Sequence, residues 1–508
     1  MSEGNRDSIV TLARQGGITL VGNISRKILG FGFIAVVTRM VSPSEYGVFT
    51  LGLSIVMFVQ GFASLNIYRS IDYFIPAYLK DREYGRARTV LRNSLLIGMY
   101  SSSVGAIALF VLRDELSMLF DESELTLVLS LFFVLIPLQT LNRTVVTSFN
   151  SIKRMRYRVV MRDVLNPLGR VFAVVAFLSA GAGLAGLVGG YLLGVSVAVA
   201  FGIVMLFREA DWIRYSSFDA ISNRSLLSYS LPLVFAGVMY TLVSQIDYFV
   251  IGFFQNSDEV GYYRVGYMLA VNLLIVLTAL TPVFKPMVSE NRHDSNVLRE
   301  RYRLATRWIT ILTIPLAVPL IVAPDVYLGI VFTEAYTVAG PAVAALAVGY
   351  MINAGYGPEG MILEGLGHTR LTLFNTVLLV GINAFLDFVL VPRFGILGAG
   401  IATGCGLTVA GAVGVLEIYL LKGFQPYSWR TVRVWMAGAL AFALGITFVS
   451  VVNRQIVVAC LLPLISAVSF LIGLRTLGGF TQGDVKLIAK LDRRLTIRLV
   501  EMVLSPGE

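Results

Sequence analysis

The sequence predicts an all-α membrane protein with about 14 transmembrane helices. Of its 508 residues, 56% are hydrophobic and only 14% are charged, and the mean hydropathy is +0.76. Apolar runs of about 20 residues, which is the length that crosses a bilayer, recur along the whole chain. Lys and Arg are concentrated in every second segment that connects these runs, as expected for a chain that crosses the membrane repeatedly. These features together exclude a soluble globular protein.

The apolar runs predict the following spans, each with an error of about two to four residues at its boundaries: 17–38, 47–66, 93–112, 125–147, 164–181, 184–206, 230–254, 261–281, 306–329, 339–363, 371–391, 395–420, 433–452 and 456–474. The first run is full length and follows a polar segment. We therefore expect it to remain in the protein as a helix rather than to act as a cleaved signal peptide. The tail 484–504 places its apolar residues on one stripe, which predicts an amphipathic helix on the inner membrane surface.

The Lys and Arg residues predict the orientation, because cytoplasmic loops of membrane proteins are enriched in both. When the N-terminus is placed in the cytoplasm, most of the 41 basic residues fall in inner segments. Arg26, Lys27, Arg143 and Arg170 are assigned to the membrane, and the residues assigned to the outer side, in loops or close to the ends of spans, are Arg39, Arg113, Arg264, Arg393 and Arg454. We therefore expect both termini in the cytoplasm and an even number of spans.

The net charge of +10 is better explained by this orientation and by contact with anionic lipid than by nucleic-acid binding. Cys405 and Cys460 fall in apolar spans, and His293 and His368 lie far apart in predicted loops, so we expect neither a disulfide nor a metal site. The sequence has no Walker A lysine loop, which argues against an ATPase. We expect no cofactor.

The first span contains the strongest candidate for a functional site. If this helix enters the hydrocarbon near Gly17, Arg26 lies about 13 Å deep, close to the middle of a core about 30 Å thick. A cation at that depth costs on the order of 3 kcal/mol. One side of the helix carries Thr19, Asn23, Arg26, Lys27 and Gly30, and we expect this side to face a wet cavity. The alternative is snorkelling toward the headgroups, which covers only part of that depth and leaves Asn23 unexplained.

Three short echoes indicate an internal repeat with a period of about 214 residues. They pair Ser44-Glu45-Tyr46-Gly47-Val48-Phe49 with Asp258-Glu259-Val260-Gly261-Tyr262-Tyr263, Arg156 with Arg370, and Gly183-Leu184-Ala185-Gly186 with Gly395-Ile396-Leu397-Gly398. The offset equals six spans, so both copies have the same orientation and form parallel repeats about the membrane normal. We predict an N-terminal six-helix lobe at 1–222, a C-terminal six-helix lobe at 223–428, two additional transmembrane helices at 429–476 and a cytoplasmic amphipathic tail at 477–508.

Other polar residues within the spans are further candidates for the site. Arg170 in the fifth span is expected either to line the cavity opposite Arg26 or to form a salt bridge with another helix. Asp247, beside Gln245 in the seventh span, is a candidate because a carboxylate within a membrane helix is costly; the alternatives are a structural ion pair and a position near the interface. Asp387 lies five residues before Pro392 and is expected near the membrane interface.

Several motifs resemble those of the polysaccharide (Wzx-type) flippases, and they follow one another along nearly the whole chain. They are Arg39 with Pro43-Ser44-Glu45-Tyr46-Gly47, Tyr229-Ser230-Leu231-Pro232, Gln245-Ile246-Asp247, Gly252, Glu259-Val260-Gly261-Tyr262-Tyr263, Gly365-Leu366-Gly367-His368-Thr369-Arg370, and Val391-Pro392-Arg393-Phe394-Gly395 followed by Gly398-Ala399-Gly400. That family belongs to the multidrug/oligosaccharidyl-lipid/polysaccharide exporter superfamily. Each motif is short, and their order and spacing together carry the resemblance.

The resemblance implies a transporter, not an enzyme, that moves a lipid-linked oligosaccharide from the inner to the outer leaflet of the cell membrane by alternating access. Its partners would be this substrate, membrane lipid and glycan assembly enzymes. The carrier would be an isoprenoid phosphate or pyrophosphate, and Arg and Lys suit such a head group. On this hypothesis the substrate-binding residues are Arg26, Lys27, Asn23, Arg170, Asp247 and Gln245.

Three alternatives remain open from the sequence. One is a multidrug exporter of the same superfamily, although exporters of cationic drugs typically rely on acidic cavities. Another is the related exporter of the peptidoglycan lipid precursor. The alternative of a different class is a membrane glycosyltransferase or polymerase. Such an enzyme usually needs a substantial soluble region, whereas the loops of this chain are short.

Overall fold

The computed structural model describes residues 21–479, without the side chains of residues 282 and 283, and every regular element in this range is a helix. Eleven of these helices are long and apolar enough to cross a membrane. The prediction of an all-α membrane protein is therefore confirmed. Thr19 and the predicted amphipathic helix at 484–504 lie outside the described residues.

Every predicted span coincides with a helical segment in the described range. The eleven long helices are fewer than the predicted spans for two reasons. The helix over residues 21–37 and α9 (Asn166–Ser179) are too short in the described range to be counted, and α19 (Thr369–Lys422) covers two predicted spans. The exact number of membrane crossings therefore stays a prediction.

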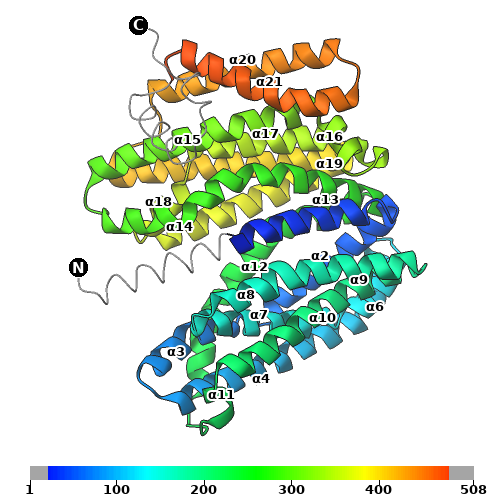
Figure 1. The fold of residues 1–508 in the computed structure, drawn as a ribbon, viewed down its shortest axis with the longest axis vertical. Coiled ribbons are helices and arrows are strands. Elements are labelled where there is room, and N and C mark those ends of the chain that lie inside the picture. Colours follow the sequence, from blue (N-terminus) through cyan, green and yellow to red (C-terminus); the bar gives the residue numbers. More distant parts are fainter. Residues whose placement is uncertain (1–20, 480–508) are drawn as a thin grey trace. The chain divides into compact units, whose positions relative to one another are not determined.

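The chain forms two compact units, which Figure 1 shows in sequence colours. Unit 1 contains the described residues up to Met268 together with Val331–Ala339 and Val380–Ala402, and unit 2 contains Leu269–Ile330, Gly340–Leu379 and the described residues from Thr403 onward. The predicted lobe boundaries remain a prediction.

After the helix over residues 21–37, the elements that lie in unit 1 follow in this order: α2 (Pro43–Ala63), α3 (Tyr68–Lys80), α4 (Tyr84–Val111), α5 (Arg113–Leu119), α6 (Glu124–Phe132), α7 (Leu135–Ser151), α8 (Met155–Val159), the π-helix η1 (Val160–Leu165), α9, α10 (Gly183–Glu209), α11 (Trp212–Tyr215), α12 (Asn223–Phe254), most of α13 (Ser257–Val271), and the 3₁₀ helix η3 (Glu334–Ala339).

Unit 2 contains the 3₁₀ helix η2 (Asn272–Leu274), α14 (Ile275–Glu290), α15 (Ser295–Val322), nearly all of α16 (Pro324–Val331), α17 (Gly340–Tyr356), α18 (Glu359–Gly365), α20 (Trp429–Val451) and α21 (Gln455–Thr476). The helix α19 contributes residues to both units. The helices α20 and α21 pack on each other and on α15. Their core includes Ile314, Val434, Ala437 and Phe470.

A capping box fixes the start of α2. The hydroxyl of Ser42 accepts a hydrogen bond from the backbone N–H of Glu45, and the carboxylate of Glu45 accepts one from the backbone N–H of Ser42. Proline is tolerated at the first position of a helix, where Pro43 stands, because its missing N–H would have no partner there. The motif Pro43-Ser44-Glu45 is therefore a helix start as well as a family signature.

Two pairs of glycines from the predicted repeat occupy matching surroundings within unit 1. A Cβ atom on Gly47 would overlap the backbone of Ser257, and one on Gly261 would overlap the carbonyl oxygen of Pro43. The starts of α2 and α13 thus approach each other in the same way from both sides. Gly183 and Gly395 both have positive φ, at 51° and 55°, and these glycines begin α10 and break α19. This correspondence supports the repeat.

Small residues let α9 and α10 pack backbone against backbone. A Cβ atom on Gly190 would lie 2.6 Å from the Cα of Val174, and one on Gly194 would lie 2.6 Å from the Cα of Arg170. These two glycines are four residues apart and therefore share one face of α10. Because that face has no side chain at either position, α9 lies close enough for Arg170 to reach Tyr191 on α10.

Candidate functional site

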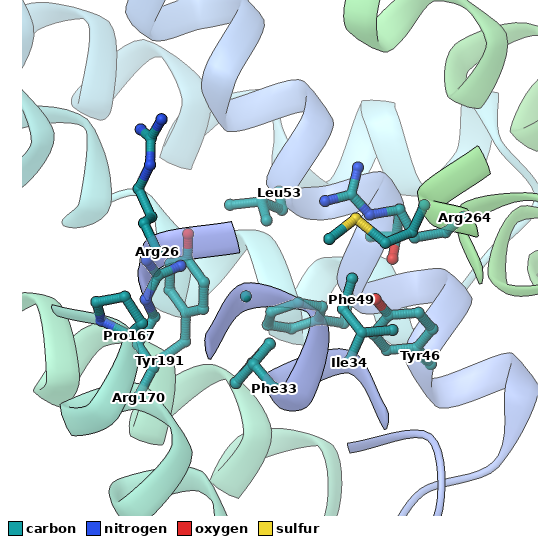
Figure 2. A pocket seen from close by; sticks show the side chains of 13 residues that line it. Arg26, Phe33, Ile34, Tyr46, Phe49, Leu53, Pro167, Arg170, Tyr191 and Arg264 are labelled. Carbon is teal, nitrogen blue, oxygen red and sulfur yellow. The ribbon is translucent and has the colours of Figure 1, made fainter. Parts of the chain in front are cut away.

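A cavity of about 160 Å³ lies within unit 1 and is lined by three arginines. The helix over residues 21–37, α2, α9, α10 and α13 all contribute to its wall, as Figure 2 shows. The lining residues are Arg26, Gly30, Phe33, Ile34, Tyr46, Phe49, Thr50, Leu53, Pro167, Arg170, Tyr191, Arg264 and Met268. None of these thirteen described residues is acidic, so the wall carries positive charge only.

Arg26 combines access to the cavity with a single electrostatic anchor. Its side chain is 48% exposed, and its Nε lies 3.7 Å from Oδ1 of the fully buried Asp163 in η1. That separation is longer than the roughly 2.7–2.9 Å of a charge-assisted hydrogen bond. The guanidinium is therefore oriented by Asp163 while most of its donors remain available.

Arg170 is held against an aromatic ring. Its Nε donates to the backbone carbonyl of Asn166 at 3.3 Å, and its guanidinium carbon lies 4.7 Å from the ring centroid of Tyr191. The ring of Tyr191 also packs against Phe33 and Phe49. Cation–π contact and aromatic packing together fix the arginine in place. Figure 2 shows Arg170 beside Tyr191 on the same side of the cavity as Arg26.

Arg264 lines the opposite side of the cavity in Figure 2. It lies in α13 and donates through one terminal nitrogen to the hydroxyl of Tyr248 at 3.0 Å. It also hydrogen-bonds the hydroxyl of Tyr46. The sequence analysis assigned Arg264 to the outer side because it lies near the end of a predicted span. In the structure α13 begins at Ser257, so Arg264 lies inside a helix and at the cavity.

Replacing the acceptor of Arg264 should destabilise the fold around the cavity. Tyr248 is 1% exposed, so Tyr248→Phe removes the buried hydroxyl that accepts from the half-buried guanidinium of Arg264. We expect a loss of about 1–3 kcal/mol in the free energy of unfolding, measured by thermal unfolding of the detergent-purified protein. Tyr240→Phe is the matched control, because Tyr240 lies on the same helix and is 76% exposed. Equal melting temperatures for the two variants would contradict the assignment.

Of the six predicted site residues, the four besides Arg26 and Arg170 are not among the residues that line this cavity. The Oδ1 atom of Asn23 accepts a hydrogen bond from Arg162 at 3.2 Å, and the side chain of Lys27 is half-buried. Gln245 donates to Ser244 Oγ at 3.1 Å, while Asp247 is buried at 6% exposure. The structure thus brings Arg26 and Arg170 together at one cavity. The substrate-binding role of all six residues stays a prediction.

Asp247 belongs to a separate buried group that includes Asp387. The hydroxyl of Tyr263 donates to Asp247 Oδ2, and the carboxyl group of Asp387 lies near that of Asp247. Asp387 is fully buried, whereas the sequence analysis expected it near the membrane interface. The sequence did not indicate that these two residues, from α12 and α19, would meet.

Sequence reasoning missed Asp163, Tyr191 and Arg264 as parts of the site. Asp163 falls just before the predicted fifth span and reads as part of a basic inner loop. Tyr191 is one aromatic residue among many in an apolar run. Arg264 follows the echoed motif at 258–263 directly, and only this position distinguished it from other cations at span ends.

Comparison with known proteins places this fold and these motifs in context. The chain is 23% identical over 443 residues to the probable low-salt glycan biosynthesis flippase Agl15 of Haloferax volcanii, covering 86% of this chain and 89% of the relative. Among solved structures it is similar to the lipid II flippase MurJ in an inward closed conformation, with a TM-score of 0.68, 16% identity and coverage of 90% of this chain and 98% of that one.

A second similar structure is the inward-facing conformation of a multidrug resistance MATE family transporter of the MOP superfamily. It has a TM-score of 0.65 and 15% identity, and the alignment covers 78% of this chain and 94% of that one. At these identities the two structures establish the fold alone, which is that of an all-helical membrane protein.

The profile of a family described as polysaccharide biosynthesis protein matches residues 36–341. The match begins before the Pro43-Ser44-Glu45 helix start and runs through the cavity arginines Arg170 and Arg264. It covers more than half of the chain and confirms the resemblance drawn from the motifs. The chain therefore belongs to the polysaccharide biosynthesis protein family.

Proposed function

We propose that this protein is a flippase that moves a lipid-linked oligosaccharide from the inner to the outer leaflet by alternating access. The substrate would be an oligosaccharide on an isoprenoid phosphate or pyrophosphate. Its head group is anionic and rich in hydroxyls, and its tail stays in the lipid. The protein would act as a transporter and not as an enzyme.

The observation that carries the proposal is the cavity with Arg26, Arg170 and Arg264 in its wall and no acidic lining residue. Guanidinium groups bind phosphate oxygens through two parallel hydrogen bonds. Cations within membrane helices are costly and mark substrate pathways. Aromatic neighbours such as Tyr46 and Tyr191 add hydroxyl groups and flat surfaces to the same wall. The wall therefore matches an anionic, hydroxylated head group better than a neutral or cationic one.

Family membership and the name of the relative Agl15, a probable glycan biosynthesis flippase, support the same substrate class. Outward movement of an anion also runs with an inside-negative membrane potential, which is worth about 2.3 kcal/mol per charge per 100 mV. The translocation step therefore does not need ATP in principle.

Two of the three alternatives, the multidrug exporter and the glycosyltransferase or polymerase, fit the cavity less well. A multidrug exporter for cationic compounds would need acidic residues where this cavity has arginines. The exporter of the peptidoglycan lipid precursor would share the positive charge, and the similarity to MurJ reaches only the fold. A glycosyltransferase or polymerase would need acidic groups at the site, and the cavity described here has none in its lining.

The test is transport in proteoliposomes. Fluorescently labelled isoprenoid-pyrophosphate oligosaccharide is placed in both leaflets, and a membrane-impermeant quencher reports the fraction that reaches the outer leaflet with time. We expect translocation that requires the protein and that is inhibited by excess inorganic pyrophosphate on the accessible side. Translocation no faster than in protein-free vesicles would contradict the proposal.

We further propose that the protein resides in the cell membrane with both termini in the cytoplasm, where glycan assembly enzymes would deliver the substrate. The distribution of Lys and Arg among the loops supports this orientation.

Reporter fusions test the orientation. Fusions after Glu122 and Glu334 are expected to report an outer location, and fusions after Arg88, Arg303 and Arg494 an inner one. The physical reason is that loops rich in Lys and Arg are retained in the cytoplasm. Alkaline phosphatase and green fluorescent protein, fused at each position in turn, give reciprocal signals. An outer location for the Arg494 fusion would mean an odd number of membrane crossings.

A further inference from the structure

A buried carboxylate next to the cavity is shared between two arginines. Asp163 accepts from Nε of Arg162 at 2.7 Å and from a terminal nitrogen of the same residue at 3.1 Å. Its Oδ1 also lies 3.7 Å from Nε of Arg26. Asp163 has no exposed surface, while Arg26 is half exposed. One negative charge therefore faces two positive charges, and it holds them with unequal strength.

The backbone explains why this carboxylate reaches a neighbouring helix. Asp163 lies in the π-helical turn η1, and such turns are rare and frequently occur at functional sites. Opposite it stands Gly22, where a Cβ atom would lie 2.8 Å from Asp163 Oδ2. The missing side chain at Gly22 allows the two helices to approach. Asp163 then lies beside Arg26, which is one turn further along the helix over residues 21–37.

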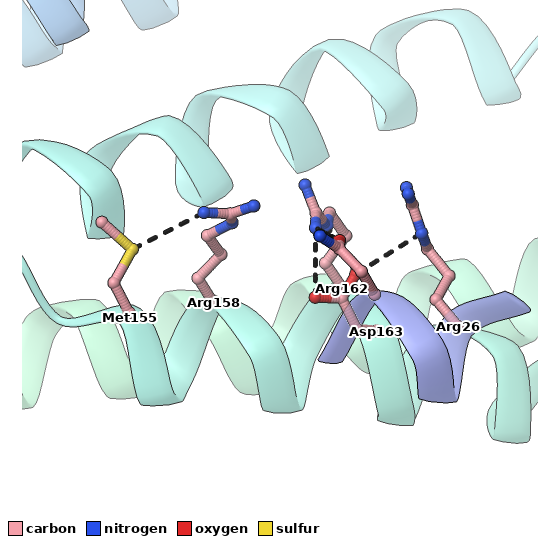
Figure 3. A network of polar contacts seen from close by, with 6 residues as sticks. Arg26, Met155, Arg158, Arg162 and Asp163 are labelled. Atoms are coloured by element: carbon pink, nitrogen blue, oxygen red, sulfur yellow. Dashed lines mark hydrogen bonds and ion pairs between the residues drawn. The ribbon is translucent and has the colours of Figure 1, made fainter. Parts of the chain in front are cut away.

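Arg158 is a further cation near Asp163, and it lies in α8, directly before the π-helix η1 that contains Arg162 and Asp163. Figure 3 shows the guanidinium groups of Arg158, Arg162 and Arg26 in a row. We call these three residues the arginine row. Arg158 donates only a weak hydrogen bond to Met155 Sδ at 3.6 Å, and no carboxylate among the described residues lies within 4 Å of it. Burial, followed by the positive charge of Arg162, lowers the pKa of Arg158. The row therefore has more positive charge than its own carboxylate neutralises.

We infer that Asp163 is a positioning residue that serves as an internal counterion, which holds Arg26 in place while the cavity is empty and gives it up to the phosphate of an incoming head group. This inference rests on the proposed function. The bidentate contact keeps Asp163 on Arg162, and the longer contact leaves Arg26 exchangeable. A permanent internal competitor lowers the affinity for the anion, which favours release on the far side of the membrane.

The sign of an affinity change tests this role. The probe is inorganic pyrophosphate, titrated calorimetrically into the full-length protein in detergent. Asp163→Asn keeps the shape of the side chain and removes the charge that competes with pyrophosphate for Arg26. We therefore expect the Kd for pyrophosphate to fall by about tenfold, a change of the size expected for one modest charge-assisted contact. In an Arg26→Gln background, which has no cation at this position, the same substitution should change the Kd by less than about twofold, because coupling through Arg26 is then lost.

Glu209→Gln is the matched control. Glu209 pairs with Arg154 at 3.1 Å and with Arg156 at 3.3 Å, outside the arginine row. Like Asp163→Asn, the Glu209→Gln substitution removes one carboxylate charge from a site that contacts two arginines. We expect it to leave the Kd for pyrophosphate unchanged. A Kd for Asp163→Asn that is unchanged or higher, or a gain that is equal in both backgrounds, would overturn the inference.

A second variant keeps the inference testable if Asp163→Asn does not fold. Asn23→Asp is nearly isosteric and adds a second internal carboxylate beside Arg162, so pyrophosphate binding should weaken by about tenfold; unchanged or tighter binding would overturn the inference. Failure of the proposed function gives a different result, because Arg26→Ala would then bind pyrophosphate as tightly as the wild type. If Arg26→Ala loses binding and Asp163→Asn gains none, only the role of Asp163 is wrong.

Discussion

Arg26→Ala is expected to abolish export of the lipid-linked oligosaccharide while the protein still inserts into the membrane. The substitution removes the half-exposed cation of the cavity wall. Loss of a charge-assisted contact to phosphate is worth about 1.5–3 kcal/mol, which corresponds to roughly 10- to 100-fold weaker binding of the head group. It also leaves the buried Asp163 with Arg162 alone. The measurement is accumulation of the substrate in the inner leaflet of cells with matched protein levels.

Two further variants at the same turn of the helix separate geometry from charge. Arg26→Lys should retain only part of the activity, because an ammonium group is a point charge and cannot form the two parallel hydrogen bonds of a guanidinium. Lys27→Ala removes a neighbouring cation that is not among the cavity-lining residues, so it should reduce export less than either change at Arg26. Normal export by Arg26→Ala would show that this cation is structural and would remove the anion-binding role.

Gly47→Ala is expected to prevent most of the protein from folding. A methyl group at this position would overlap the carbonyl oxygen and carbon of Ser257, both of which are backbone atoms and cannot rotate away. Overpacking of a tight contact costs about 1–3 kcal/mol or more, and here the starts of α2 and α13 would have to separate. The measurement is the monodisperse yield and the melting temperature of the detergent-purified variant.

The reciprocal variant and a neutral one complete this experiment. Gly261→Ala should be similarly harmful, because its methyl group would overlap the carbonyl oxygen of Pro43. Gly32→Ala has no atom within 4 Å of the added methyl group and should behave as the wild type. Gly47→Ala with the stability of Gly32→Ala would mean that the two helix starts do not need this close approach.

The contacts of the three cavity arginines show where positive charge is balanced and where it is left over. Arg264 is satisfied by tyrosine hydroxyls and Arg170 by a carbonyl and an aromatic ring, so neither depends on a carboxylate. Neutral partners of this kind fix a guanidinium without cancelling its charge. The cavity therefore keeps its positive potential, and only Arg26 at its edge is partly neutralised by Asp163.

The sequence by itself determined the class of the protein, the helical segments and the presence of a costly cation at Arg26. These properties are local, because a membrane helix must satisfy its backbone hydrogen bonds within about 20 consecutive residues and must bury apolar side chains along that length. The motifs that mark the family are equally local, since Pro43-Ser44-Glu45 is a helix start and Gly395 is a helix break.

The tertiary structure alone decided which side chains meet. Asp163 reaches Arg26 because Gly22 leaves room on the facing helix, and Arg170 reaches Tyr191 because Gly190 and Gly194 let α9 and α10 touch. Asp387 meets Asp247 across a sequence separation that no periodicity reveals. Such pairs depend on the rotation of each helix about its axis and on the distance between axes. Both are set by packing with small residues and not by the hydropathy of either helix.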